Sequence, residues 1–291
     1  MTAATTRHVL GWLAGDGSRH GPPNVPVLAI SGAQGAGKTT LLRELPRRLF
    51  DAAGYRVAAL SLDDFYLTRR ERLALGRQVH PLFVTRGVPG THDLVLLENV
   101  LDDLRSGRGA TIPHFDKALD DRAEAGAWTR IEAGSLDLIV IEGWCLGLPP
   151  EPESALVEPI NELERLEDPA GVWRREVNRA LATSYRQLFT SFDWVVALLA
   201  PSFEAVYDWR YQQEQALAAS LGASDSRQKL LTEPAELRRF LAHFERLTRH
   251  AFRCLPNLAQ LLLKLDEARR VVHVVHLVSG ETPGSRSPDQ Q

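Results

Sequence analysis

The chain has 291 residues, a net charge of −3 and an apolar fraction of 44%, which together suit one large α/β domain with insertions. A net charge so close to zero gives no global attraction to nucleic acid or to an anionic membrane, so any anion-binding site must be local. The two cysteines, Cys145 and Cys254, are too few and too far apart for a disulfide framework or a metal-ligand pair. We therefore expect a cytoplasmic protein with no nucleic-acid or membrane partner.

The composition of the two ends sets the expected limits of the domain. Residues 1–24 contain neither the apolar block of a signal peptide nor a run long enough to span a membrane, so we interpret them as a leader. Residues 279–291 are rich in proline, serine and glycine, which is typical of a disordered tail. The domain itself is therefore expected over residues 25–278.

The segment VLAISGAQGAGKTTLL carries the strongest functional signal. An apolar run over residues 25–30 predicts a buried strand, and a helix is predicted from Lys38 onwards, which Pro46 should kink or end near Leu45. The loop between them matches G-x-x-x-x-G-K-T, in which backbone N–H groups and the helix dipole attract phosphates. Lys38 would neutralise the transferred phosphoryl group, and Thr39 would ligate magnesium. The candidate nucleotide-binding residues are Gly32, Ala33, Gln34, Gly35, Ala36, Gly37, Lys38, Thr39 and Thr40.

A second buried strand is predicted over residues 55–62, and it leads into the segment Asp63-Asp64-Phe65-Tyr66. Ligands of doubly wound sheets bind beyond the carboxyl ends of the strands, where these residues fall. Phosphorylation of an alcohol needs a group that accepts the hydroxyl proton, so Asp63 is the candidate general base and Tyr66 a candidate substrate contact. The alternative is a pair of solvated turn acids.

Cations are concentrated between residues 68 and 86. For residues 69–77 we predict a solvated helix face. Arg86 differs, because it opens the turn RGVPGTHD ahead of a helix predicted over residues 93–104. His92 and Asp93 can either cap this helix or contact a substrate.

A polar loop over residues 111–122 contains alternating acids and bases, among them Asp116, Lys117 and Arg122. Such a loop beside a phosphate site can clamp a substrate, and it can equally be a surface loop with local ion pairs.

A third buried strand is predicted over residues 135–143, and it ends in Glu142. A carboxylate at this position of a phosphate-loop protein lies beside the loop and holds magnesium or its bound water. The two motifs support each other, and the alternative is an ordinary strand-end acid.

The C-terminal half begins with an acidic, proline-rich segment, residues 149–169, which we expect to be an exposed excursion. Arg210 can close over the phosphates as a lid arginine, or it can pair with Glu214 one turn further on. The other predicted elements are a helix over 172–188, a strand over 193–199, a helix over 201–221, a helix from Pro234 capped by Thr232, a helix over 258–265 and a strand over 271–278.

Six segments together resemble the D-glycerate 3-kinase family and its bacterial and fungal kinase-like relatives: SGAQGAGKTT, SLDDFYLT, RGVPGTHD, FDKALDDR, LIVIEGWCLG and VYDWRYQQE. The resemblance covers residues 25–275 approximately, and the plan is similar to uridine kinase, phosphoribulokinase and pantothenate kinase. It implies a P-loop three-layer α/β sandwich with a mostly parallel sheet, helices on both faces and a helical lid.

The resemblance also implies an activity, namely transfer of the γ-phosphate of ATP to the 3-hydroxyl of D-glycerate. We further expect Mg²⁺ as a cofactor and a monomeric or homodimeric protein. Lys38, Asp63, Glu142 and Arg210 would be catalytic, and Thr39 and Glu142 would hold the metal. The residues expected around the substrate are Asp63, Tyr66, Arg86, His92, Asp93, Asp116, Lys117 and Arg122.

Two other functions remain open at this point. The first is a kinase for another small alcohol, such as a nucleoside, pantothenate or a sugar. The second is a nucleotide-dependent regulatory ATPase without an acceptor. The guanine-reading motif Asn-Lys-x-Asp does not occur in the sequence, which argues against a GTPase.

Overall fold

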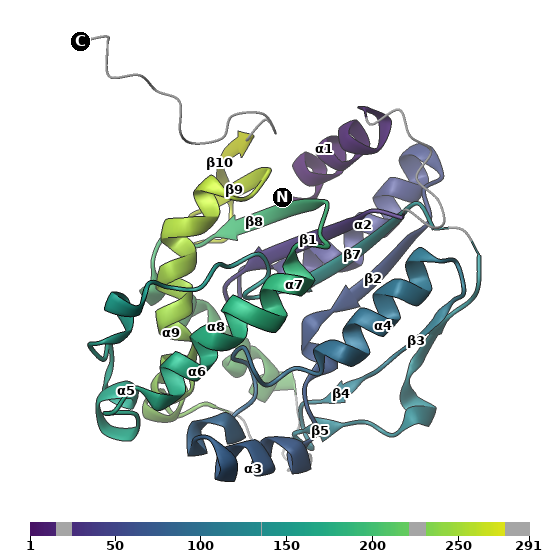
Figure 1. Cartoon of the computed structure of the whole chain (residues 1–291). Helices are drawn as coiled ribbons and strands as arrows, with labels where there is room; N and C mark the ends of the chain where they lie inside the picture. Colours follow the sequence, from purple (N-terminus) through teal and green to yellow (C-terminus); the bar gives the residue numbers. More distant parts are fainter. Residues whose placement is uncertain (16–24, 135, 221–230, 277–291) are drawn as a thin grey trace, which may run out of the picture.

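A computed structural model of the chain describes residues 1–15, 25–134, 136–220 and 231–276. Within these residues, six strands form the main sheet in the order β10-β9-β8-β1-β7-β2 (Figure 1). Neighbouring strands are parallel except β9 and β10 at one edge, so the sheet is mostly parallel, as predicted. The strands are β1 Val27–Gly32, β2 Val57–Ser61, β7 Leu138–Gly143, β8 Trp194–Leu199, β9 Leu261–Leu265 and β10 Val271–His276.

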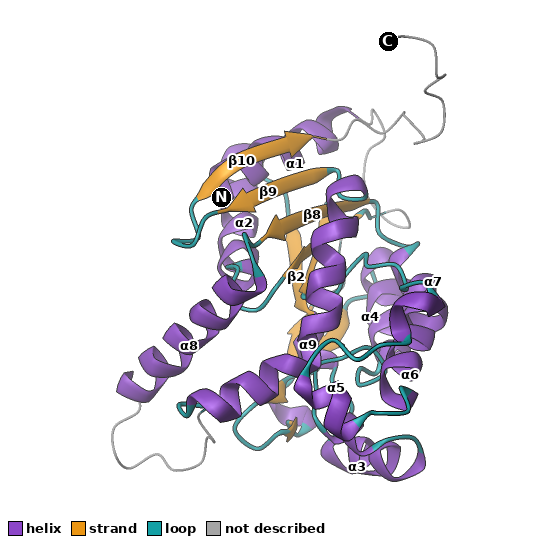
Figure 2. Cartoon of the chain, turned by 90° about the vertical axis from the view of Figure 1, so that its left-hand side faces the viewer, coloured by secondary structure: helices purple, strands orange, loops and turns teal. Residues whose placement is uncertain are grey.

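Helices cover both faces of this sheet (Figure 2). Side chains of a strand alternate between the two faces, so the fully buried strand β1 contributes to two cores. Val27 and Ala29 pack in the core that contains α4, α6 and α9, whereas Leu28 and Ile30 pack in the core that contains α1, α2 and α8. The predicted three-layer α/β fold is therefore confirmed. The helices are α1 Thr2–Gly15, α2 Lys38–Ala53, α3 Arg69–Gln78, α4 Leu94–Arg105, α5 Glu162–Glu167, α6 Val172–Ala180, α7 Arg186–Phe189, α8 Phe203–Ser220 and α9 Pro234–Cys254.

The helix that follows the phosphate loop does not end near Leu45, because α2 continues through Pro46 to Ala53. A proline inside a helix costs about 3 kcal/mol through the lost amide donor and steric conflict. Leu45 and Leu49, on either side of Pro46, are both completely buried. Packing of this face against the sheet therefore offsets the cost of the proline.

Two predictions for the C-terminal half are wrong. Residues 258–265 do not form a helix, because Leu261–Leu265 is strand β9, paired with β8 on one side and β10 on the other. A short apolar run has no periodicity that separates a buried strand from a buried helix. Thr232 does not cap α9 either, because Glu233 occupies the N-cap position and makes no side-chain cap.

The arginine-rich helix α3 is only partly a solvated face. Arg72 is buried, and its guanidinium donates to the carbonyl oxygens of Leu67 and Val84 at 3.2 and 2.7 Å. Residues 111–122 are also more regular than predicted. They contain most of β3 (Ala110–Ile112), which pairs with β6 (Thr129–Ile131), together with β4 (Phe115–Asp116), which pairs with β5 (Asp121–Arg122).

The acidic segment 149–169 is not an exposed excursion. Leu156, Leu163 and Glu164 are buried, and Arg246 of α9 donates to both carboxylate oxygens of Glu164 at 2.8 and 2.6 Å. The buried charge of Glu164 is thus compensated by a bidentate arginine, which attaches α5 to α9.

The N-terminal helix α1 packs against α2, and its Val9 and Leu13 are buried in the core that lies on that side of the sheet. No helix in the described ranges is long and apolar enough to cross a membrane. The last residues of the predicted leader, 16–24, the end of the predicted strand at residues 277–278 and the predicted tail over 279–291 lie outside the described residues.

We predict that Arg246→Met destabilises the protein by roughly 3–5 kcal/mol, because it leaves the buried Glu164 carboxylate without its partner. Urea unfolding followed by circular dichroism measures this loss. A matched control is Arg239→Met, which removes a pair between the same two helices, Arg239 with Glu167, whose side chains are 54% and 40% exposed. The control should cost about 1 kcal/mol or less, and equal losses in both variants would contradict the prediction.

Candidate active site

The phosphate loop connects β1 to α2, and its shape depends on glycine. Gly35 and Gly37 have φ angles of +79° and +94°, which side-chain-bearing residues rarely adopt. A Cβ atom on Gly35 would lie 2.7 Å from the Cβ atom of Trp209 on α8, and one on Gly32 would lie 2.9 Å from that of Leu198 on β8. The backbone of the loop therefore lies directly against β8 and α8, with no room for side chains at these two positions.

Lys38 and Thr39 begin α2 and face the end of strand β7. The Lys38 ammonium donates to the carbonyl oxygen of Ala33 at 3.0 Å, and burial lowers its pKa against the opposing effect of Glu142 and Asp63. The Thr39 hydroxyl donates to Glu142 Oε1 at 3.2 Å, and the Ser61 hydroxyl donates to the same oxygen at 2.8 Å. These contacts follow from strand pairing, since Glu142 lies opposite Ser61 of β2 and Ile30 of β1.

The oxygens of Thr39 and Glu142 are of the kind that Mg²⁺ prefers beside a nucleoside triphosphate. The described residues contain no group of three or more histidine, cysteine, aspartate or glutamate side chains that could hold a metal ion. This donor set fits an ion that takes its remaining ligands from phosphate oxygens and water.

Asp63 lies in the short 3₁₀ turn Leu62–Phe65 that follows β2. Its Oδ1 accepts a hydrogen bond from the Tyr66 hydroxyl at 2.7 Å, and its Oδ2 accepts one from the Lys117 ammonium at 2.7 Å. Burial raises the pKa of the Asp63 carboxyl, but the charge and hydrogen bond of Lys117, the Tyr66 hydroxyl and the charge of Lys38 outweigh burial and hold the pKa well below its ordinary value. Asp63 is therefore ionised at neutral pH.

One cavity of about 190 Å³ borders both the phosphate loop and Asp63. Twelve of its lining residues were predicted from the sequence: Gln34, Gly35, Gly37, Lys38, Thr39, Thr40, Asp63, Tyr66, Arg86, Lys117, Glu142 and Arg210. The structure thus brings candidates from both the nucleotide-binding and the acceptor-side sets to one cavity.

Four candidates for substrate contact do not line this cavity. Asp93 caps α4 by accepting from the amide of Leu96 at 3.0 Å, and it also pairs with Arg122 at 3.1 Å. Asp116 accepts from two backbone amides of the turn after β4. Asp93, Asp116 and Arg122 thus stabilise the segments beside the cavity.

His92 is the fourth of these candidates, and it stacks on Tyr66 with ring centroids 4.6 Å apart. Its Nδ1 forms a hydrogen bond with the hydroxyl of Tyr185, which lies in the π-helical turn Leu181–Tyr185 between α6 and α7. Burial lowers the pKa of His92 to about 4, so the imidazole is neutral at physiological pH. The His92 ring therefore packs against Tyr66, which lines the cavity, and does not line the cavity itself.

The structure shows the pairing of Arg210 with Glu214, and closure of Arg210 over the phosphates stays a prediction. Its guanidinium pairs with Glu214 one turn along α8 and lies over the ring of Phe240 on α9, 6.0 Å from the centroid. It also lines the cavity beside the loop. The buried Glu214 in turn accepts from the amide of Leu231 at 2.9 Å. The Glu214 carboxylate thus holds the Arg210 guanidinium beside the phosphate loop.

Three aromatic residues of the cavity were missed in the sequence analysis: Trp144, Phe240 and Phe244. Trp144 follows the strand-end acid by two residues and donates from Nε1 to the carbonyl oxygen of Gly87 at 2.7 Å. Phe240 and Phe244 lie one helical turn apart on the apolar face of α9, a spacing that indicates burial and gives no hint of a ligand. Ser61 was also missed, and its position at the end of β2 was the only available signal.

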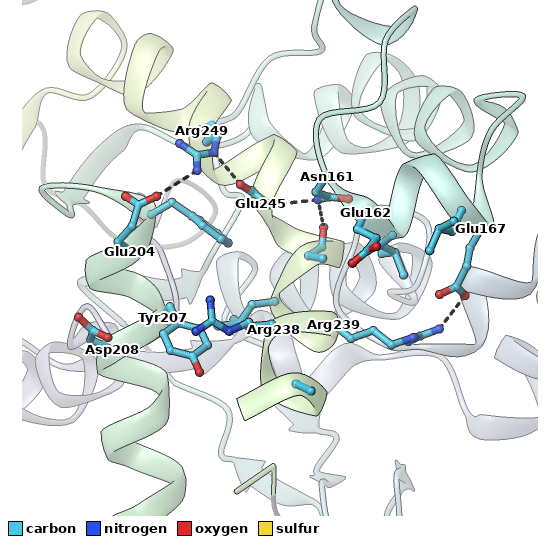
Figure 3. Close-up of a pocket in the computed structure, with 16 residues that line it drawn as sticks. Asn161, Glu162, Glu167, Glu204, Tyr207, Asp208, Arg238, Arg239, Glu245 and Arg249 are labelled. Carbon is cyan, nitrogen blue, oxygen red and sulfur yellow. Dashed lines mark hydrogen bonds and ion pairs between the residues drawn. The ribbon is translucent and has the colours of Figure 1, made fainter. Parts of the chain in front are cut away.

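A larger cavity, of about 860 Å³, lies between α5, α8 and α9 and has no lining residue from the phosphate loop (Figure 3). Many of its charges are paired. Arg249 bridges Glu204 and Glu245 at 3.3 and 2.8 Å, Arg239 pairs with Glu167 at 2.6 Å, and Arg238 lies over the ring of Tyr207. Its size alone therefore does not make it the site of phosphoryl transfer.

The comparisons with known proteins agree with the geometry. No protein-family model matches the chain. It is 36% identical over 211 residues to an uncharacterized kinase of Schizosaccharomyces pombe, mug58, in a match that covers 68% of this chain and 74% of that protein. It is 34% identical over 204 residues to the chloroplastic D-glycerate 3-kinase of Arabidopsis thaliana, which covers 66% of this chain but only 41% of the plant protein.

A solved structure of D-glycerate 3-kinase from Cryptococcus neoformans var. grubii has the same fold, with a TM-score of 0.76, 25% identity, and coverage of 95% of this chain and 99% of that one. Phosphate-loop chemistry, a strand-end acid and homology to kinases along most of the chain all agree. The chain therefore belongs to the D-glycerate 3-kinase family of P-loop kinases, and it is an ATP-dependent enzyme that phosphorylates an alcohol group of a small molecule.

Proposed function

We propose that this kinase transfers the γ-phosphoryl group of ATP to the 3-hydroxyl of D-glycerate, which gives 3-phosphoglycerate and ADP. One observation carries the proposal: Lys38 and Thr39 of the loop border the same cavity as Asp63, Lys117 and Arg86. A small hydroxy acid needs a base for its hydroxyl and cations for its carboxylate, and both kinds of group are present. The similarity to two D-glycerate 3-kinases supports this acceptor.

In the proposed reaction, the 3-hydroxyl oxygen forms a bond to the γ-phosphorus, and the bond from that phosphorus to the oxygen bridging it to the β-phosphorus breaks. Asp63 accepts the hydroxyl proton. Lys38 and Arg210 stabilise the charge on the transferred group, and Arg210 would exchange Glu214 for phosphate oxygens. Thr39 and Glu142 would hold Mg²⁺, which when bound supplies positive charge that offsets the charge developing on the phosphate oxygens.

The aromatic residues Trp144, Phe240 and Phe244 favour a second candidate, a kinase for a ring-bearing alcohol such as a nucleoside, because aromatic side chains pack well against flat rings. The small volume of the cavity favours the smaller acceptor.

Three further points remain predictions. They are the division of the chain into residues 1–24, 25–278 and 279–291, a monomeric or homodimeric state, and a cytoplasmic location. Size-exclusion chromatography with light scattering tests the oligomeric state directly.

The acceptor is tested by measuring ADP release from MgATP with D-glycerate, L-glycerate, uridine, pantothenate and no acceptor in parallel, and by identifying the product. We expect release with D-glycerate and formation of 3-phosphoglycerate, because the chain is similar to two D-glycerate 3-kinases. Release with uridine alone would support the second candidate. Acceptor-independent release that no compound increases would contradict both.

We predict that Asp63→Asn lowers kcat by about 10²–10⁴-fold, because the amide cannot accept the hydroxyl proton. Single-turnover phosphorylation of the acceptor measures the chemical step. Affinity for a fluorescent ATP analogue is the control and should stay close to that of the wild type, since Asp63 lies on the acceptor side of the cavity. Turnover within a few-fold of the wild type would show that another group takes the proton.

We predict that Glu142→Gln raises the Mg²⁺ concentration needed for half-maximal activity by at least tenfold or so, because a neutral amide holds the ion or its water less strongly than a carboxylate. A magnesium titration at constant ATP measures this change. Ser61→Ala removes only a hydrogen bond to Glu142 and should have a smaller effect of the same sign. An unchanged magnesium titration in Glu142→Gln would remove Glu142 from the metal site.

A further inference from the structure

The turn between β4 and β5 supplies a counter-ion to two groups of the acceptor side at once. Its first residue, Lys117, pairs with Asp63 at 2.7 Å. Its last residue, Asp120, pairs with Arg86. The turn thus neutralises both a carboxylate and a guanidinium that border the cavity.

These two contacts differ in how firmly the turn residue is held. Asp120 also pairs at 3.1 Å with Arg72, which is 1% exposed, and its backbone oxygen accepts from the same guanidinium. Moving Asp120 would leave the buried Arg72 charge without its carboxylate. The Lys117 side chain is 53% exposed, and Asp63 is its only ion-pair partner in the described part of the chain. Lys117 can therefore exchange its partner, whereas Asp120 cannot do so easily.

The ion pair with Lys117 also occupies one of the two carboxylate oxygens of Asp63, the proposed general base. Oδ1 of Asp63 already accepts from the Tyr66 hydroxyl, and Oδ2 accepts from Lys117. An acceptor hydroxyl must form a hydrogen bond with one of these oxygens before its proton can be transferred. Tyr66 is buried and stacked on His92, so it is the less mobile of the two donors. The exposed ammonium is the group that can leave.

The other cations of the cavity do not compete for this role. Arg86 is paired with Asp120, Arg210 with Glu214, and Lys38 donates to the phosphate loop. In D-glycerate a single carbon atom separates the carboxyl carbon from the carbon that bears the 3-hydroxyl. A hydroxyl at Asp63 therefore brings the acceptor's carboxylate within reach of Lys117, the nearest exchangeable cation.

We propose that Lys117 is a specificity-determining residue that blocks Asp63 until a carboxylate on the acceptor takes its ammonium group. An anionic acceptor then exposes the base that it needs, and a neutral alcohol leaves the base blocked. In the step that follows, the hydroxyl proton passes to Asp63 Oδ2 as the oxygen bonds to the γ-phosphorus and ADP leaves with the electron pair of the broken bond. Lys117 keeps its proton throughout. This inference rests on the proposed function, because it takes Asp63 as the base.

The test compares D-glycerate with glycerol, in which a hydroxymethyl group replaces the carboxylate. We expect wild-type kcat/KM to favour D-glycerate on the order of 10⁴-fold. In Lys117→Met the value for D-glycerate should fall by about 10²-fold or more, while the value for glycerol stays the same or rises, so the ratio collapses. Lys117→Arg keeps the charge and should keep most of the selectivity. Lys264→Met changes an exposed lysine of β9 and is the matched control, with no expected change in the ratio.

A pH measurement separates this role from a purely structural one. Lys117 lowers the pKa of Asp63, so its removal should move the acid limb of the kcat/KM profile up by roughly 1–3 pH units. A ¹³C NMR titration of the Asp63 carboxyl, assigned with Asp63→Asn, gives the same information without turnover. In the wild-type protein with a non-hydrolysable ATP analogue, D-glycerate should raise this pKa and glycerol should not.

Several results would overturn the inference. One is an equal fall of kcat/KM for both acceptors in Lys117→Met with an unmoved acid limb. Another is an Asp63 carboxyl whose pKa does not change when D-glycerate is added. A third is efficient phosphorylation of an uncharged acceptor by the wild type. If the wild type instead uses a different carboxylate-bearing alcohol and Lys117→Met loses selectivity for it, the D-glycerate proposal fails and the inference stands.

Discussion

The parallel pairing of β7 with β1 on one side and β2 on the other is the constraint on which the site depends. It places the carboxyl ends of the three strands side by side, with Glu142 at the end of β7 and with the phosphate loop and Asp63 directly after β1 and β2. Strands β1 and β7 are buried along their whole length, and β2 buries Ala58 and Leu60, so a shift of register by one residue would turn core side chains toward the wrong face. The same packing that holds the sheet together therefore sets the spacing of the candidate catalytic groups.

Around these strand ends, the protein neutralises its own charges. Asp63 forms an ion pair with Lys117, Arg86 with Asp120, Arg210 with Glu214, and Arg122 with Asp93. In a partly buried cavity an unpaired charge is costly, so internal counter-ions stabilise the site before any ligand binds. The pairs differ in burial, and this difference determines which of them a substrate can break. Specificity can thus come from the contacts that the ligand replaces as well as from those that it makes.

Helices α8 and α9 border both the cavity at the phosphate loop and the larger cavity. Arg210 and Phe240 line the cavity at the phosphate loop, whereas Tyr207, three residues before Arg210, and Arg238, two residues before Phe240, line the larger one. The ring of Tyr207 lies under the Arg238 guanidinium, and Phe240 lies under that of Arg210. Arginine–aromatic contacts therefore connect these two helices in both places.

The sequence by itself determined the order of strand, phosphate loop and helix, the acids at the ends of β2 and β7, and the class of fold, because glycine spacing and buried apolar runs are local properties. It misassigned residues 258–265 and the burial of Arg72, since each depends on neighbours distant in sequence. Only the tertiary structure decided which polar residues distant in sequence meet. Lys117 reaches Asp63 across 54 residues, and Arg122 turns to Asp93. Ion pairing over such separations follows from how the chain packs, which no local pattern encodes.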